Sequence, residues 1–380
     1  MTKLEELIQK LCPDGVEHKP LNEVSEMKRG TSITKKDIVE GEIPVVSGGR
    51  EPAYYCDKYN RDGETITVAG SGAGAGYVQY WTKPIFVCDA FSIQGNPGIQ
   101  TKYIYYFLTN IQDYIYSTKK GGGVPHVHIS SIENVSVPVP PLPVQREIVR
   151  ILDNFTELTA ELTAELTARK QQYAYYRDKL LTFGDVRVGV TSDVIRRTLG
   201  EVCKISAGGD APKNSMSKQK TEKYSVPIIS NGIGENALYG YTDAPKVEEP
   251  AVTVAARGTI GYAEYRDYPF YPIIRLLTAI PKDSTVVNTK YLYYCLQGKQ
   301  YSVPMGGIPQ LTAPELKKVE IPIPSLDVQN RIVQVLDNFD AICTDLNIGL
   351  PAEIEARQKQ YEYYRDKLLT FTPADCPGRR

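Results

Sequence analysis

The 380-residue sequence has no run of apolar residues that approaches the length of about 18 needed to cross a membrane as a helix. Its first residues, MTKLEELIQK, lack the apolar core of a secretory signal. The seven cysteines are odd in number and never form a CxxC pair, which excludes a disulfide framework or a zinc ribbon. We therefore expect reduced thiols, no metal site and a cytoplasmic location.

The chain also has almost no net charge, and it contains few Trp and Phe residues. The 44 Lys and Arg residues balance 45 Asp and Glu residues, which leaves a formal charge of −1. The chain as a whole is therefore unlike a nucleic-acid binder, and any such binding must come from local clusters. Tyrosine is abundant instead, at 27 residues against 8 Phe and 1 Trp. Its large ring with a polar tip suits half-exposed faces and interfaces.

Motifs that carry chemistry are absent. The sequence has no GxxxxGK(S/T) phosphate loop, no HExxH, no GxSxG and no (D/N)PP(Y/F) motif of amino-methyltransferases. The glycines of GSGAGAG at 70–76 would let backbone N–H groups approach a phosphate. However, the YVQYW that follows has the pattern of a strand, and a dinucleotide site needs a helix there. We therefore favour a β-turn, and we expect a chain that is not an enzyme and binds no cofactor.

The sequence contains an internal repeat. VQREIVRILDNF at 144–155 recurs as VQNRIVQVLDNF at 328–339, and QYAYYRDKLLTF at 172–183 recurs as QYEYYRDKLLTF at 360–371. Weaker matches precede these blocks in the same order, such as TVAGSGAGAGYVQY and TVAARGTIGYAEY. The chain is thus a tandem duplication of a variable part followed by a nearly invariant part, and the second invariant part has four additional residues.

The invariant parts have the pattern of long helices, because apolar residues recur at every third or fourth position. We expect a helix from Pro143 to Phe183, roughly 60 Å long at about 1.5 Å per residue. Such a helix needs a partner, and the second invariant part provides one. Gly349 and Pro351 interrupt the second pattern, so Pro351 should start a separate helix that ends at Phe371.

The variable parts have the pattern of mixed α/β domains. Short runs of Val, Ile, Tyr and Thr at Ile66–Val68, Tyr77–Tyr80 and Val252–Val254 predict strands, and 101–116 and 289–301 predict helices. The expected fold class is α+β: a tandem duplication of a mixed α/β domain and a long helix. The two long helices are predicted to pack as an antiparallel coiled coil with pseudo-twofold symmetry.

Local clusters of polar residues in the variable parts are candidates for contact with nucleic acid. Lys and Arg lie beside glycine, serine and threonine, a combination that contacts phosphate through side chain and backbone. His126 and His128 alternate in VPHVH, and without a third ligand we interpret them as exposed polar groups suited to a base edge. The candidate DNA-binding residues are Lys28, Arg29, Thr31, Lys35, Lys36, Arg50, Ser71, Lys119, Lys120, His126, His128, Lys213, Asn214, Ser215, Lys218, Asn231, Arg257, Thr259 and Gln310.

The invariant parts resemble a known family. The blocks PVPPLPVQREIVRILDNF and IPIPSLDVQNRIVQVLDNF, each followed later by YYRDKLLTF, resemble the helical spacers of the DNA-specificity subunit of type I restriction–modification systems. The alternation of variable and invariant parts resembles that family over the whole chain. The repeated TAEL at 159–162 and 163–166 resembles the subgroup of the EcoR124 systems, type IC.

The resemblance implies a non-catalytic reader of double-stranded DNA. Each variable part would be a target-recognition domain for one half of a bipartite, asymmetric target. The spacers would fix the distance between half-sites and bind two modification (methyltransferase) subunits, which use S-adenosylmethionine. Restriction subunits would add translocation and cleavage driven by ATP with Mg²⁺.

A set of spacer residues is expected to contact either the partner subunits or the other helix, and the sequence leaves both possibilities open. They are Gln145, Ile148, Leu152, Phe155, Leu158, Leu162, Leu166, Tyr176, Arg177, Gln329, Ile332, Leu336, Phe339, Tyr364 and Arg365.

The expected boundaries follow the repeat. The first variable part, called module 1, is expected at 1–141 and the first spacer at 142–184. The second variable part, called module 2, is expected at 185–325, the second spacer at 326–372 and a tail at 373–380. Two other functions stay open: a protein-binding scaffold without DNA specificity, and a nucleotide-dependent enzyme that uses GSGAGAG. A steep salt dependence of DNA binding would separate the DNA reader from the scaffold.

Overall fold

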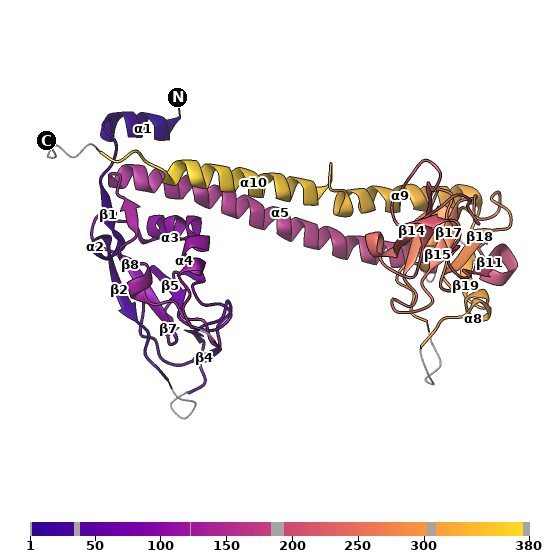
Figure 1. Cartoon of the computed structure of the whole chain (residues 1–380), viewed down its shortest axis with the longest axis horizontal. Coiled ribbons are helices and arrows are strands. Elements are labelled where there is room, and N and C mark those ends of the chain that lie inside the picture. Colours follow the sequence, from indigo (N-terminus) through magenta and orange to yellow (C-terminus); the bar gives the residue numbers. More distant parts are fainter. Residues whose placement is uncertain (1, 34–38, 122, 184–193, 302–308, 375–380) are drawn as a thin grey trace. The chain divides into compact units, whose positions relative to one another are not determined.

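The computed structural model describes residues 2–33, 39–121, 123–183, 194–301 and 309–374 (Figure 1). The chain divides into two compact units: unit 1 is Met1–Thr163 with Glu353–Arg380, and unit 2 is Ala164–Ala352. Each unit thus contains one module, the first part of that module's own spacer and the last part of the other spacer. The boundaries expected from the repeat remain a prediction.

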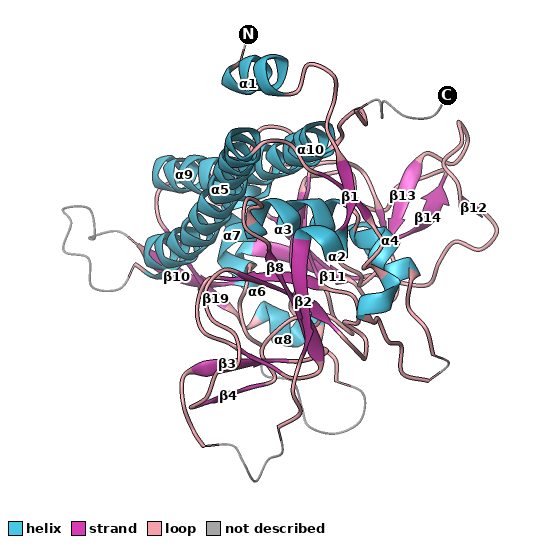
Figure 2. Cartoon of the chain, turned by 90° about the vertical axis from the view of Figure 1, so that its left-hand side faces the viewer, coloured by secondary structure: helices cyan, strands magenta, loops and turns pink. Residues whose placement is uncertain are grey.

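Module 1 is built on two small sheets (Figure 2). The larger sheet is antiparallel, in the order β2 (Ser25–Arg29), β8 (Ala90–Gly95), β5 (Thr65–Ala69) and β6 (Val78–Trp81). The smaller sheet has the order β4 (Tyr54–Cys56), β3 (Ile43–Val46) and β7 (Phe86–Val87). The helices are α1 (Lys3–Leu11), α2 (Leu21–Val24), α3 (Thr101–Asn110), α4 (Gln112–Ser117) and a 3₁₀ turn, η2 (Ile129–Ser131). A separate pair, β1 (His18–Pro20) with β9 (Ser136–Pro138), joins the two ends of the module.

Module 2 repeats this arrangement. Its larger sheet has the order β11 (Cys203–Ala207), β18 (Leu277–Pro281), β15 (Ala251–Val254) and β16 (Ala263–Arg266). Its smaller sheet has the order β12 (Met216–Ser217), β14 (Leu238–Thr242), β13 (Val226–Ile229) and β17 (Tyr271–Pro272). The helices are α6 (Leu199–Val202), α7 (Thr289–Leu296), α8 (Ala313–Lys317) and a 3₁₀ turn, η3 (Gly234–Ala237), and β10 (Ile195–Thr198) pairs with β19 (Glu320–Ile323).

The central strands explain why these segments form sheets. All five residues of β5 and all four of β15 are buried, because α3 packs against β5 and α7 packs against β15 while the opposite face is also covered. Runs of β-branched residues favour this doubly covered, pleated setting. The predicted mixed α/β modules are therefore confirmed.

The spacers are helical, as predicted. The first forms one helix of 41 residues, α5 (Leu142–Thr182), and the second forms α9 (Leu326–Thr344) and α10 (Leu350–Leu369) (Figure 1). At the break, the Asp345 side chain accepts hydrogen bonds from the backbone N–H groups of Asn347 and Ile348. A Cβ atom on Gly349 would lie 2.6 Å from the carbonyl oxygen of Ala341. Only glycine fits that position, in agreement with the predicted interruption. The packing of the two spacers as a coiled coil remains a prediction.

Two predicted helices differ from those observed. The helix expected over 289–301 ends at Leu296, because Gly298 takes a left-handed backbone conformation with φ of 73°. The helix expected over 101–116 is two helices, α3 and α4, separated at Ile111.

The chain ends return to module 1. Pro373 pairs with Val16 in a parallel bridge, and the backbone N–H of Ala374 donates to the carbonyl of Val16. The rest of the expected tail, 375–380, lies outside the described residues. Within the described ranges, no helix combines the length and the apolar character needed to cross a membrane.

Candidate nucleic-acid interface

Each module is joined to its own spacer by a buried glutamine. In unit 1 the Gln145 amide oxygen accepts from the backbone N–H of Gln100 at 2.9 Å, and its nitrogen donates to the carbonyl of Pro140 at 2.8 Å. In unit 2 the Gln329 oxygen accepts from the N–H of Asn288 at 2.9 Å, and its nitrogen donates to the carbonyls of Val286 and Pro324. Both amides are about fully buried, so these hydrogen bonds replace water at the joint.

A carboxylate forms the second contact of each joint. Lys102 lies 2.8 Å from Asp153, and Tyr106 donates its hydroxyl hydrogen to the same carboxylate. Burial, and then the hydrogen bond to Asp153, raises the pKa of Tyr106. The corresponding residues of unit 2 are Lys290, Tyr294 and Asp337, which make the same contacts. Sequence reasoning missed these residues, although the repeated KYxYY and LDNF blocks contain them.

The last part of each spacer packs on the module of the other copy. In unit 2 the Tyr173 hydroxyl donates to the Gln297 side chain at 2.9 Å, and burial raises the pKa of Tyr173 to about 12. In unit 1 the Arg365 guanidinium donates to the Asn110 side chain at 2.8 Å. The two invariant parts therefore exchange their ends between the modules.

The predicted spacer residues line these contacts. Ile148, Leu152, Ile332 and Leu336 are buried, whereas Leu158, Leu162 and Leu166 are half-buried. In unit 1 the ring of Phe155 stacks on Tyr364 with centroids 5.5 Å apart, and in unit 2 Phe339 stacks on Tyr176 at 6.0 Å. Arg177 lies against Gly298, where an added Cβ would be 3.3 Å from its Nη1 atom. These residues thus contact the other helix or the module; whether they also bind a partner remains a prediction.

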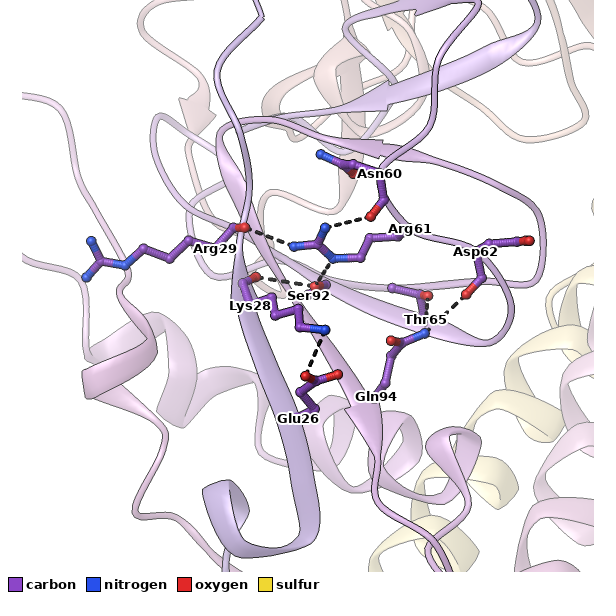
Figure 3. Close-up of polar contacts among 9 residues, drawn as sticks. All are labelled: Glu26, Lys28, Arg29, Asn60, Arg61, Asp62, Thr65, Ser92 and Gln94. Carbon is purple, nitrogen blue, oxygen red and sulfur yellow. Dashed lines mark hydrogen bonds and ion pairs between the residues drawn. The ribbon is translucent and has the colours of Figure 1, made fainter.

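The basic cluster on β2 is partly neutralised (Figure 3). Lys28 forms an ion pair with Glu26 at 2.7 Å, whereas the Arg29 side chain is exposed and points away from the sheet. The strand end is held by Arg61, which donates to Ser92 Oγ at 2.6 Å and to the carbonyl of Arg29 at 2.9 Å. Burial lowers the pKa of Arg61. Arg61 was not among the predicted residues, and its hydrogen bond holds the backbone carbonyl of Arg29.

The GSGAGAG loop of module 1 lies between Asp89 and the histidine segment. Ser71 donates its hydroxyl hydrogen to the carboxylate of Asp89, and its backbone pairs with His126. The rings of His126 and His128 stack at 5.9 Å with an angle of 6° between their planes. Because the single hydroxyl hydrogen of Ser71 goes to Asp89, Ser71 does not have the hydrogen bond to histidine that an activated nucleophile needs.

A cluster of donors forms the equivalent loop of module 2. The Gln310 side-chain oxygen accepts from Arg257 Nε and Nη2, at 3.0 and 2.7 Å, and from Arg275 Nη1 at 3.1 Å. Asn231 links two segments of the cluster: its side chain accepts from the N–H of Ala256 and donates to the carbonyl of Ile274. Four predicted residues, Asn231, Arg257, Thr259 and Gln310, thus meet here with one that was missed, Arg275.

The remaining candidates lie apart from these two clusters. Lys119 lies over the ring of Tyr116, Lys218 over Tyr239 and Arg50 over Tyr77, at 4.4, 3.7 and 5.0 Å from the centroids. Five further candidates have exposed or half-buried side chains: Thr31, Lys120, Lys213, Asn214 and Ser215. Lys35 and Lys36 lie outside the described residues.

The GSGAGAG segment is a turn between two strands. Strand β5 precedes it and β6 follows it, paired antiparallel with Val68 opposite Val78. Gly72 and Gly76 take positive φ angles of 77° and 85°, which other residues adopt at a cost. With a strand where a dinucleotide site needs a helix, this finding favours the turn over the nucleotide-binding loop.

Comparison with known proteins points to one family. The model of the type I restriction modification DNA specificity domain matches residues 13–169 and 191–356. A putative type I specificity subunit of Mycoplasma pneumoniae is 34% identical over 82% of this chain and 95% of its own length. A putative type I restriction enzyme specificity subunit of Haemophilus influenzae is 32% identical over 98% and 99%. The EcoR124 specificity subunit of Escherichia coli is 33% identical over 71% of this chain and 70% of its own length.

Solved structures show the same fold. The S subunit of a type I restriction–modification system from M. genitalium matches with a TM-score of 0.62 at 18% identity, over 93% of this chain and 96% of that chain. These findings favour the DNA-specificity interpretation over a protein-binding scaffold. With two matched domains that together span most of its length, the chain belongs to the family of type I restriction–modification DNA specificity subunits.

Proposed function

We propose that the chain reads a bipartite, asymmetric DNA sequence, with module 1 recognising one half-site and module 2 the other. The observation that carries this proposal is that equivalent sheets present different loops. Strand β5 pairs with β8 in the register in which β15 pairs with β18, yet the following loop carries Ser71 in module 1 and Arg257 in module 2. Base contacts specify a sequence, so different side chains on one scaffold support two different half-sites.

The spacers would set the distance between the half-sites. Each TAEL repeat adds four residues, which lengthen a helix by about 6 Å and turn it by roughly one turn plus 40°. Leu158, Leu162 and Leu166 are half-buried, whereas Glu161 and Glu165 are exposed, so an added repeat nearly preserves the apolar stripe. A repeat thus changes length with little change of packing, as a spacing device requires.

Two equal surface patches support the binding of two copies of one partner. Tyr175 is 59% exposed and Tyr363 is 61% exposed, and both belong to the repeated YYRDKLLTF block. Lys179 lies 5.7 Å from the ring of Tyr175, and Lys367 lies 5.9 Å from that of Tyr363. Exposed tyrosines beside cations are typical of interfaces. We assign these patches to two methyltransferase subunits.

Catalysis would belong to those partners and to restriction or translocase subunits, in the cytoplasm. The methyltransferase subunits would use S-adenosylmethionine, which supplies the methyl group, and the translocase subunits would use ATP with Mg²⁺. One solved structure that shares this fold, at 18% identity, is described as part of the complex assembly of a type I system, which supports such partners. This chain would contribute DNA contacts and the frame.

The experiment is to co-express the chain with its methyltransferase subunit and to map methylated adenines across a genome. We expect one split motif, with two unlike half-sites at a fixed gap. A continuous motif, or a well-folded complex that methylates no motif, would overturn it. Pure chain is expected to show no methyltransferase, ATPase or nuclease turnover, and measurable turnover would contradict that part.

A further inference from the structure

We propose that one loop site, at the same place in both modules, contacts a base edge of each half-site. The site in module 1 does so as a hydrogen-bond acceptor and the site in module 2 as a hydrogen-bond donor. In module 1 the site is formed by Ser71 and Asp89, and in module 2 by Arg257, Arg275 and Gln310. The module 1 site accepts hydrogen bonds from an exocyclic amino group, and the module 2 site donates to the acceptor edge of guanine. This inference rests on the proposed reading of DNA by both modules.

The strand registers establish that the two sites are equivalent. Val68 lies opposite Phe91 in β5 and β8, and Val254 lies opposite Leu277 in β15 and β18. Ser71 and Arg257 each lie three residues after the first member of these pairs, and Asp89 and Arg275 each lie two residues before the second member.

The third side of each site is also equivalent. Val127 donates its N–H to the carbonyl of Gly70, as Leu311 does to the carbonyl of Ala256. This contact aligns the preceding residues, His126 and Gln310, at the same loop.

The module 2 site offers donors only. Its one acceptor, the Gln310 side-chain oxygen, is already occupied by both arginines. In the described part of the chain, Arg257 Nη1, Arg275 Nη2 and Gln310 Nε2 have no hydrogen-bond partner, and neither guanidinium has an ion pair. Guanine is the base that presents two adjacent acceptors, N7 and O6, in the major groove. The donor set therefore matches guanine.

The backbone at Arg275 is held in an unfavourable conformation. Ile274 and Arg275 have φ angles of 52° and 59°, the left-handed region that side chains disfavour. Asn231 donates to the carbonyl of Ile274 at 2.6 Å, and the Arg275 N–H donates to the carbonyl of Gly208 at 2.9 Å. Strain of this kind persists where the surroundings impose it, and it clusters at functional sites. Here it brings Arg275 to the amide that Arg257 also contacts.

The module 1 site offers an acceptor in the equivalent place. Asp89 is exposed, it accepts from Ser71, and no cation lies within ion-pair distance of it among the described residues. A carboxylate that faces DNA repels the phosphates, so it favours binding only where it accepts a hydrogen bond from a base. In the major groove those donors are the amino groups of cytosine and adenine, and Asp pairs with cytosine N4.

The test uses the full chain in complex with its methyltransferase subunit, with methylation mapped genome-wide. The variants are Asp89→Asn, Arg257→Ala and Arg275→Ala. Asp57→Asn and Arg197→Ala are matched controls that remove the same charges from exposed positions of the same modules. Asp89→Asn is expected to relax one cytosine or adenine position of one half-site, by about tenfold in preference. Either arginine variant is expected to relax a guanine of the other half-site by a similar factor, and the controls leave both half-sites unchanged.

Several results would overturn the inference. If the arginine variants weaken methylation equally at all sequences and lower the salt slope, those residues contact phosphate. If Asp89→Asn and the arginine variants relax the same half-site, or relax neither, the assignment of acceptors to one module and donors to the other is wrong. The proposed function still holds in that case if the wild-type complex gives a split motif. If the wild-type complex gives no split motif, the proposed function fails and this inference fails with it. Thermal melting of each variant separates loss of reading from loss of folding.

Discussion

The side-chain oxygen of Gln145 accepts a hydrogen bond from the backbone N–H of Gln100 at 2.9 Å, and Gln329 does the same for Asn288 in the other unit. Each buried glutamine thus fixes the start of a module helix against the start of its own spacer. The joints are alike in the two units, whereas the loops at the far ends of β5 and β15 differ in charge. A constant frame with exchangeable loops is the arrangement that a change of DNA target requires.

Removing the glutamine should destabilise its unit. Gln145→Leu leaves the N–H of Gln100 and the carbonyl of Pro140 without a partner in a buried setting, and we expect a loss of about 2 to 4 kcal/mol in the free energy of unfolding. Gln329→Leu should cost a similar amount in unit 2. Denaturant unfolding measures both. Gln334→Leu, the same change at an exposed position of α9, should cost under about 0.5 kcal/mol; equal losses at 334 and 329 would refute the buried joint.

Asp340 should make unit 2 less stable at neutral pH. Burial, and then the charge of Asp337, raises the pKa of Asp340 above its usual 3.8. The folded chain therefore holds this proton more tightly than the unfolded chain, so the contribution to stability is fully present below pH 3.8 and is lost as the pH rises through the raised pKa.

The variant Asp340→Asn removes that titration. We expect it to stabilise unit 2 at pH 7 by less than about 1 kcal/mol, because the group is half-exposed and screened, and to have no effect near pH 3. Denaturant unfolding over this pH range measures the difference. Asp327→Asn, at an exposed position of the same helix, is the control, and a variant that gains nothing at pH 7 would contradict the assigned cause.

Deletion of one TAEL repeat, Thr163–Leu166, should shorten the preferred gap between half-sites by about one or two base pairs, since it removes about 6 Å of helix. The half-site bases should stay the same, because no loop of either module changes. Methylation mapping of the deleted chain measures the gap. Replacement of the same four residues by Ala keeps the length and should keep the gap; an unchanged gap after deletion would refute the role of the spacer.

The exposed tyrosines of the spacers should control the number of bound partners. Tyr175→Ala or Tyr363→Ala removes one of two equal patches, so we expect a complex with one methyltransferase subunit, and the double variant should bind none tightly. Mass determination of the purified complex measures the stoichiometry. Tyr114→Ala, an exposed tyrosine of module 1, should leave two subunits bound. Full stoichiometry in the double variant would place the partner elsewhere.

The frame was largely predictable from sequence because its signals are local. The apolar period predicts the spacer helices, and Gly349 with Pro351 predicts the break after Thr344. The exchange of spacer ends follows from the predicted antiparallel pairing, because the first spacer directly precedes module 2 in the chain. The partner of Tyr173 was not predictable, since it depends on the tertiary placement of Gln297.

The loop clusters were predicted only in part, for a different reason. Arg257 and Gln310 stand in segments that align with the first copy, and both were candidates. Asp89 and Arg275 lie just before β8 and β18, in segments whose sequences diverge, and only the strand register shows that they are equivalent. A charge just before a strand carries no signal of its own, so sequence reasoning missed both.

The most direct test of two independent readers on one frame is a module exchange. Residues 1–141 are replaced with module 1 of another family member, and the methylated motif is mapped for the complex with the same methyltransferase subunit. We expect one half-site to change while the other half-site and the gap stay the same. A change in both half-sites, or in the gap, would contradict it.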